Sequence, residues 1–111
     1  MNVIKKIALP VLMAMFLGAP VQAEVKSSAV SLSEAITHID KAIIDNNDSN
    51  FASANLHLKA ARAASELITG NDAVVKAAND NVIEGQIQSK QGNFKVSSAL
   101  LNKSLELYKS L

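Results

Sequence analysis

Apolar residues recur every three or four positions along most of this 111-residue chain, the spacing that places them on one face of an α-helix. Ser31 followed by Glu34 has the form of a capping box, so we expect the first helix to begin at Leu32. No segment alternates strictly between apolar and polar residues, as a half-buried strand would. The pattern predicts an all-α fold with four helices, over residues 32–45, 51–69, 72–91 and 93–111.

Short polar or glycine-containing segments separate the predicted helices. Residues 46–50 read Asn-Asn-Asp-Ser-Asn, a composition that favours turns and helix caps. Gly70 is suited to a left-handed cap after the second helix. Asn71 can cap the third helix, with Asp72 in its first turn, and Gly92 closes that helix. We therefore expect tight connections throughout.

The helical period also predicts which side chains face inward. In the second helix Asn55, Lys59, Arg62 and Glu66 share one face, which we expect to be exposed to solvent. The expected apolar faces are Leu32, Ala35, Ile36, Ile39 and Ile43 in the first helix, Ser53, His57, Ala60, Ala61, Ala64, Leu67 and Ile68 in the second, and Phe94, Leu100, Leu101, Leu105, Tyr108 and Leu111 in the fourth.

An internal repeat divides the four helices into two pairs. Asn50-Phe51 recurs 43 residues later as Asn93-Phe94, each time at the start of the second helix of a pair. One helical hairpin cannot bury its apolar face alone, whereas two hairpins can cover each other. We therefore predict an antiparallel four-helix bundle built from two hairpins, over residues 31–111.

The first 23 residues have the features of a secretory signal peptide. Lys5 and Lys6 precede an apolar run over residues 7–17, and Val21-Gln22-Ala23 supplies small residues for a cleavage site after Ala23. The run is shorter than the roughly 20 apolar residues that a membrane span needs. We expect a periplasmic protein without a stable membrane anchor, in which residues 24–30 form a flexible lead-in.

Removal of the signal peptide changes the composition that bears on function. The remaining 88 residues contain 9 basic and 10 acidic side chains and no methionine, cysteine or tryptophan. A nearly neutral domain has no electrostatic reason to bind nucleic acid. The missing sulfur ligands exclude thioether copper sites, Met/His-ligated haem and attached c-type haem, and no glycine-rich loop for a nucleotide is present.

The two histidines are the residues with the clearest potential for chemistry. His38 and His57 each lie about ten residues from the centre of the predicted turn, so an antiparallel pairing should bring them to the same height. Asp45 lies two turns beyond His38 and can approach from one side. Imidazole is a common ligand of copper, nickel and zinc. The alternative is that His57 is a hydrogen-bonded core histidine and that His38 is a surface residue.

Other polar residues do not suggest catalysis. Asp40, Asp45 and Asp48 lack the glycine and the final glutamate of a calcium loop, and we interpret them as a solvated helix end. No serine, aspartate or lysine is placed with either histidine as a nucleophile and its base would be. We therefore expect a protein that is not an enzyme.

Residues 34–43, Glu-Ala-Ile-Thr-His-Ile-Asp-Lys-Ala-Ile, resemble the repeated unit of the small metal-binding protein family. Members of that family are histidine-rich periplasmic four-helix bundles that bind copper, nickel and other divalent metals. The spacing from His38 to His57 is similar to that between the family's hairpin histidines, and Gly92-Asn93 falls where the family has a Gly-His turn. The resemblance implies weak binding or buffering of a divalent metal by His38 and His57.

This chain departs from the family pattern at several ligand positions. Asp45, Asn50 and Asn93 stand where the family has further histidines, and the second hairpin contains none. The resemblance carries over only His38 and His57 as ligands, with Asp45 as an oxygen substitute. It implies a metal site of lower capacity and affinity.

A weaker similarity suggests a different function. Residues 85–107 are similar to a tetratricopeptide repeat, although Ser97 and Ser104 stand where that repeat prefers alanine. Such repeats usually occur in three or more copies with a period near 34 residues. The alternative function is a protein-interaction or stress-associated bundle without metal, which uses the apolar arc of the fourth helix. We expect a monomer or a weak homodimer.

Overall fold

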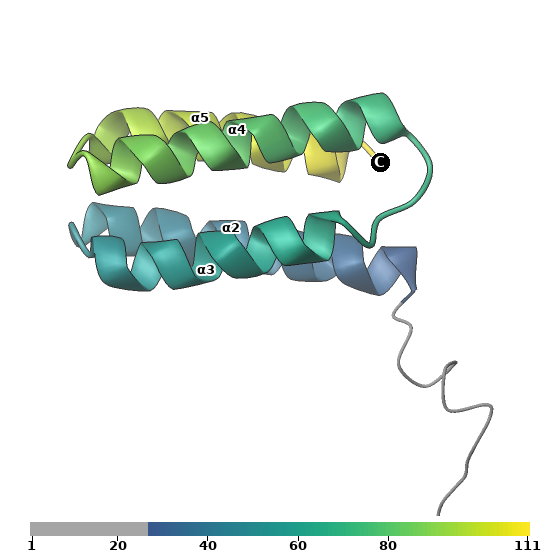
Figure 1. Cartoon of the computed structure of the whole chain (residues 1–111), viewed down its shortest axis with the longest axis horizontal. Coiled ribbons are helices and arrows are strands. Elements are labelled where there is room, and N and C mark those ends of the chain that lie inside the picture. The colour runs from purple at the N-terminus through teal and green to yellow at the C-terminus, as the bar shows by residue number, and fades with distance from the viewer. Residues whose placement is uncertain (1–26) are drawn as a thin grey trace, which may run out of the picture.

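The computed structural model describes residues 27–111, and the predicted signal peptide over residues 1–23 and residues 24–26 lie outside this range. It contains four helices, α2 (Ser28–Asn47), α3 (Phe51–Ser65), α4 (Asp72–Lys90) and α5 (Phe94–Lys109), and the described residues include no strand. The all-α prediction is confirmed, and the arrangement is compatible with a four-helix bundle (Figure 1). Among the described helices, none has the length and apolar character needed to cross a membrane.

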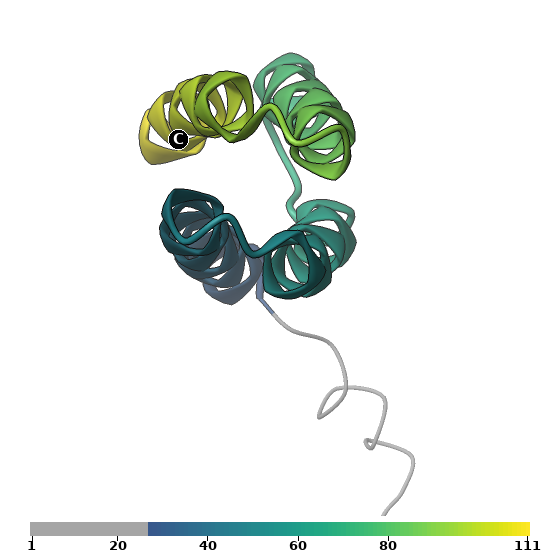
Figure 2. The ribbon, with the colours of Figure 1, turned by 90° about the vertical axis from the view of Figure 1, so that its left-hand side faces the viewer.

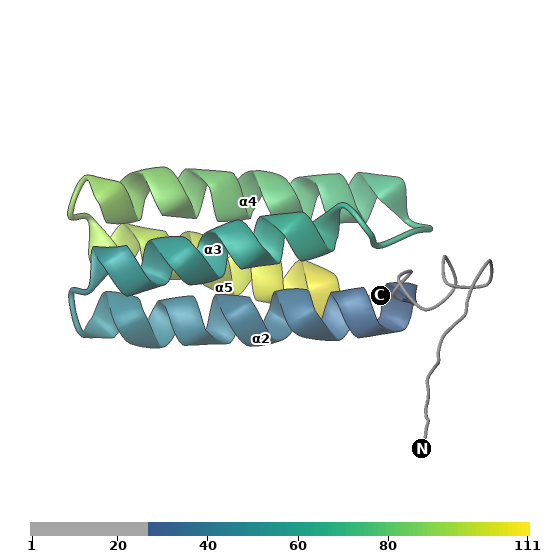
Figure 3. The ribbon, with the colours of Figure 1, turned by 60° about the horizontal axis from the view of Figure 1, so that its bottom comes forward.

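The four helices lie as two antiparallel pairs. Figure 2 shows them in cross-section around a common centre, with α2 beside α3 and α4 beside α5. A longer connection between α3 and α4 joins the two pairs at one end, and tight turns close both hairpins at the other end (Figure 3). This placement makes the two hairpins cover each other's apolar faces, as the repeat predicted.

Helix α2 begins one turn earlier than the capping-box pattern suggested. The N-cap is Ser27, whose Oγ accepts a hydrogen bond from the backbone N–H of Val30 over 3.1 Å. Ser31 is instead fully buried within the helix. Serine and alanine precede the predicted start, and because neither prevents helix formation, the helix extends back to the first serine that can cap it. The predicted lead-in therefore overlaps the helix from Ser28.

Replacing Ser27 with alanine is expected to lower the free energy of unfolding by about 0.5–2 kcal/mol, because one N-terminal amide loses its partner. Chemical denaturation of a chain that comprises residues 24–111 measures this change. Ser31→Ala is the matched control and should cost little, because the buried Ser31 hydroxyl has no hydrogen-bond partner. A large loss in Ser31→Ala with none in Ser27→Ala would contradict the assigned cap.

The second helix of the first hairpin is shorter than predicted. Helix α3 ends at Ser65 rather than Thr69, and the backbone N–H of Thr69 donates to Ser28 Oγ over 2.9 Å. Ile68 is only 7% exposed, so this segment packs against the core although it is not helical. Gly70 adopts a φ of +80°, in the left-handed region that glycine tolerates best, but it lies in the connection rather than at the helix end.

The buried faces are rotated from the expected ones. In α3 the buried residues are Ala54, Leu58, Ala61, Ala64 and Ser65, whereas His57 and Ala60 are partly exposed and Leu67 is 51% exposed. In α2 the buried residues are Ser31, Ala35, Ile39, Ala42 and Asn46, with Leu32, Ile36 and Ile43 packed at the edge. Alanine on several faces made the apolar side ambiguous, and packing between the helices selected the buried side.

Residues related by the 43-residue repeat meet in the interior, near the two ends of the helices. Ser89 Oγ donates to Asn46 Oδ1 over 2.8 Å, and Tyr108 Oη donates to Ser65 Oγ over 2.7 Å, each pair being separated by 43 positions. Asn46 Nδ2 also donates to Ser97 Oγ over 2.9 Å. The two hairpins are therefore related by an approximate two-fold arrangement and are held together by buried hydrogen bonds as well as by apolar packing.

Replacing Asn46 with alanine is expected to destabilise the fold by about 2–3 kcal/mol, because the buried hydroxyl of Ser89 loses its acceptor and Ser97 loses a donor. The neighbouring Asn47→Ala is the control, since Asn47 is exposed. Urea denaturation of both variants measures the difference. Equal stabilities would show that the amide contributes nothing to joining the hairpins.

Candidate metal site

The antiparallel pairing of α2 and α3 places the two histidines side by side. His38 Nδ1 and His57 Nδ1 are 3.2 Å apart, and the ring centroids are separated by 5.5 Å with the planes inclined at 29°. The expectation that these side chains share one height is confirmed. Nine helical residues lie between His38 and the turn over positions 48–50, and six lie between that turn and His57. At 1.5 Å per residue this difference is about 4.5 Å along the axis, less than one helical turn, so the two side chains can still meet.

The Nδ1 contact has two chemical interpretations. Without a metal, one ring can donate from a protonated Nδ1 to the unprotonated Nδ1 of the other, which requires two different tautomers. With a metal, both Nδ1 atoms present lone pairs to one ion. Two bonds of about 2.0–2.1 Å at a tetrahedral angle separate the nitrogens by about 3.3 Å. The observed separation therefore suits either a shared proton or a shared ion.

Asp45 approaches the opposite edge of His57. Its Oδ2 atom lies 3.9 Å from His57 Nε2, the ring nitrogen that does not face His38. That oxygen is buried without a hydrogen-bond partner, although the Asp45 side chain as a whole is 18% exposed. A carboxylate beside Nε2–H favours the tautomer in which Nδ1 carries the lone pair. In this position Asp45 can orient His57 for ligation.

The described residues provide only these few donors. Within residues 27–111, no group of three or more histidine, cysteine, aspartate or glutamate side chains is arranged to hold a metal ion. The repeat partners of His38, Asp45 and His57 are Asn81, Gln88 and Leu100, so the second hairpin has no equivalent site. Asn50 caps α3, its Oδ1 accepting from the backbone N–H of Ser53, whereas Asn93 occupies the N-cap position of α5 without a side-chain cap hydrogen bond.

A surface hollow of about 280 Å³ lies beside His38. Its lining includes His38 and Glu34 from α2 together with alanines and Leu67 from the α3 side. Glu34 is one helical turn before His38 and half-buried, a placement that the capping-box interpretation overlooked. The spacing of four residues on one helix was the signal that could have identified it. The hollow makes His38 accessible from solvent.

Half of the residues in the apolar arc of the last helix are buried in the core. Leu101, Leu105 and Tyr108 are at most 6% exposed and belong to the core. Val96 and Leu111, at 50% and 37% exposure, are the large apolar side chains that α5 and its end leave accessible. Scattered apolar residues of this kind are common on protein surfaces.

Comparison with known proteins adds no family to this picture. No protein-family model matches the chain, and no curated protein sequence matches it either. The class of protein is therefore defined by the fold and the site: an all-α chain with four helices that carries one histidine pair between the helices of its first hairpin.

Proposed function

We propose that the mature chain binds one divalent transition-metal ion, copper, nickel or zinc, through Nδ1 of His38 and Nδ1 of His57. The observation that supports this proposal most directly is the 3.2 Å separation of those two nitrogens. Neutral imidazole is a preferred ligand of these metals. The buried Oδ2 atom of Asp45 beside Nε2 supplies the outer-shell carboxylate that commonly accompanies a ligating histidine.

Such a site would bind its ion weakly and reversibly. Two protein ligands leave the remaining coordination positions to water or to another molecule, whereas tight structural zinc sites use four protein ligands. The function that follows is buffering or transfer of a metal ion in an extracytoplasmic compartment. The export-signal pattern of residues 1–23 supports that location.

Isothermal titration calorimetry of the mature chain with copper, nickel and zinc salts tests the proposal. We expect one ion per chain for at least one metal and loss of binding below about pH 6, because protonated imidazole has no lone pair to donate. Absence of binding by all three metals at neutral pH would refute the proposal.

A further inference from the structure

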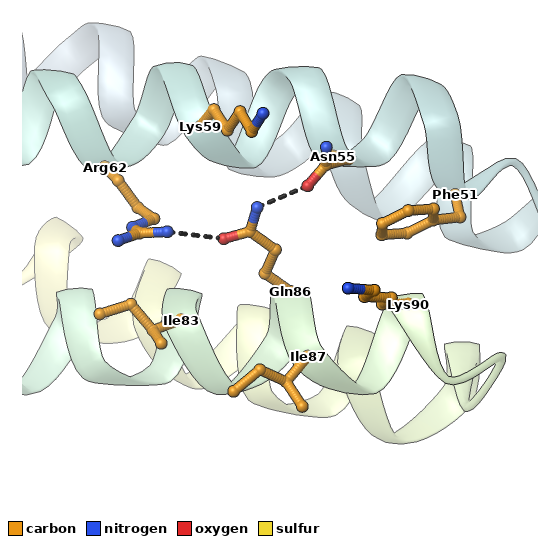
Figure 4. Close-up of a pocket in the computed structure, with 8 residues that line it drawn as sticks. All are labelled: Phe51, Asn55, Lys59, Arg62, Ile83, Gln86, Ile87 and Lys90. Carbon is orange, nitrogen blue, oxygen red and sulfur yellow. Dashed lines mark hydrogen bonds between the residues drawn. The ribbon is translucent and has the colours of Figure 1, made fainter.

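A second surface feature lies on the opposite side of α3 from the histidines. It is a groove of about 420 Å³ between α3 and α4. Figure 4 shows Phe51 on α3 beside Lys90 on α4, with Ile87 and then Ile83 further along α4. Ile87 is 42% exposed, so apolar surface remains accessible there. A volume of about 300–1,000 Å³ is typical of small-molecule sites.

Three cationic side chains, Lys59, Arg62 and Lys90, line this groove, and no acidic residue does. None of the three forms an ion pair with another residue in the described part of the chain. Arg62 is held by a 2.9 Å hydrogen bond from Nη1 to Gln86 Oε1, and the Gln86 amide in turn donates to Asn55 (Figure 4). The guanidinium is thereby oriented in the lining of the groove, and Arg62 remains partly exposed.

The fold itself does not require this concentration of positive charge. Under the 43-residue repeat, Lys59, Arg62 and Lys90 correspond to Asn102, Leu105 and Asn47. The equivalent face between α5 and α2 therefore has no cation at these three positions, although the helices pack in the same way. Because the chain as a whole is almost neutral, the cations of the groove are a local feature.

We infer that the groove between α3 and α4 binds a small amphipathic carboxylate, a single aliphatic chain with one anionic head group. The apolar side chains would contact the aliphatic part, and Lys59 and Arg62, toward one end of the groove, would attract the head group. Lys90, beside Phe51 at the other end, would add to the positive potential of the groove. Along α3 the groove runs from Phe51 to Arg62, which is about 16 Å at 1.5 Å per residue. That length suits an extended medium-chain fatty acid.

Titration with monomeric decanoate, followed by amide chemical shifts of the isotope-labelled mature chain, tests this inference. We expect saturable shifts centred on Phe51, Ile87 and Lys90, with much weaker binding of decanol and of acetate. If decanol bound as tightly as decanoate, the charge of the head group would play no part in binding. If acetate bound as tightly as decanoate, the apolar side chains of the groove would play no part. Either result would overturn the inference.

A double variant, Lys59→Gln with Lys90→Gln, isolates the cations. Both lysines are exposed and make no hydrogen bond to the rest of the described chain, so folding should be unaffected. We expect decanoate affinity to fall about fivefold. The control Lys95→Gln with Lys103→Gln removes the same charge from exposed positions of α5 and should leave affinity unchanged. Equal losses of decanoate affinity in the two double variants would refute specific binding in the groove.

Two further measurements test whether decanoate binding is independent of the histidine pair and of membrane surfaces. His57→Ala should leave decanoate binding intact, because the histidine pair lies outside the groove lining. Flotation with phosphatidylglycerol vesicles tests a membrane surface as the source of the anion. Binding to vesicles without binding to monomeric decanoate would overturn the proposed ligand, because it would indicate attraction to a charged surface.

Discussion

Replacing Tyr108 with alanine should destabilise the protein by about 3–5 kcal/mol, the largest stability effect that we expect of any single substitution. Tyr108 is the largest fully buried side chain and lies on α5. Its removal leaves a cavity between the hairpins and deprives Ser65 of its hydrogen-bond donor. Urea denaturation followed by circular dichroism measures the loss. Because small domains have only about 5–15 kcal/mol of stability, the variant should be partly unfolded at elevated temperature.

Tyr108→Phe separates the hydroxyl from the ring. It should cost about 0.5–1.5 kcal/mol through the lost hydrogen bond to Ser65. An alanine variant no less stable than the phenylalanine variant would contradict the assigned role of the ring, since filling the core would then contribute nothing.

The same phenol predicts a pH dependence. Burial raises the pKa of Tyr108 above its ordinary value of 10.0, an effect that the hydrogen bond to Ser65 partly opposes. The folded protein therefore holds this proton more tightly than the unfolded chain. The stability that Tyr108 contributes through this pKa difference is fully present below about pH 10. It is lost as the pH rises from there through the folded pKa. In Tyr108→Phe this loss should be absent. Tyr108 is the chain's single tyrosine, so tyrosinate absorbance follows its ionisation directly.

Removal of either imidazole should abolish metal binding. The two Nδ1 atoms that would hold the ion are 3.2 Å apart, and His38→Ala or His57→Ala removes one of them. A single imidazole binds divalent metals poorly. Calorimetry under the conditions that saturate the unmodified chain measures the loss. Asp40→Asn is the control, because Asp40 is exposed on the same helix and should not alter affinity.

Asp45→Asn tests whether the carboxylate of Asp45 orients His57. If Asp45 orients His57 from the Nε2 side, this variant should retain one ion per chain and lose about 10–100-fold in affinity. Unchanged affinity would show that the carboxylate does not act on the site. Retention of full affinity in either histidine variant would contradict the two-imidazole site itself.

The histidine pair could be anticipated because its position depends on counting alone. In an antiparallel hairpin with a known turn, the heights of His38 and His57 follow from their distances to that turn. Their 3.2 Å approach confirms this reasoning. The position of Asp45 relative to the pair could not be obtained in the same way, because it depends on side-chain rotamers and on the tilt between the helices.

The basic groove was missed for a related reason. Asn55, Lys59 and Arg62 were expected to face solvent because they are polar and share one side of a helix. In the structure that side faces α4, where Gln86 bridges Asn55 and Arg62. The amino acids of one helix cannot reveal which polar side chain another helix will bring opposite them.

The sequence alone determined that this chain is helical, that its helices form two related hairpins, and that its histidines lie level with each other. These properties depend on local periodicity, turn residues and the 43-residue repeat, all of which act over short or regular distances. Only the tertiary structure decided which helix faces are buried and where the helix ends fall. Alanine and serine are small enough to occupy either a core or a surface position, so the choice was made by packing between the hairpins, through contacts such as Asn46 with Ser89 and Tyr108 with Ser65.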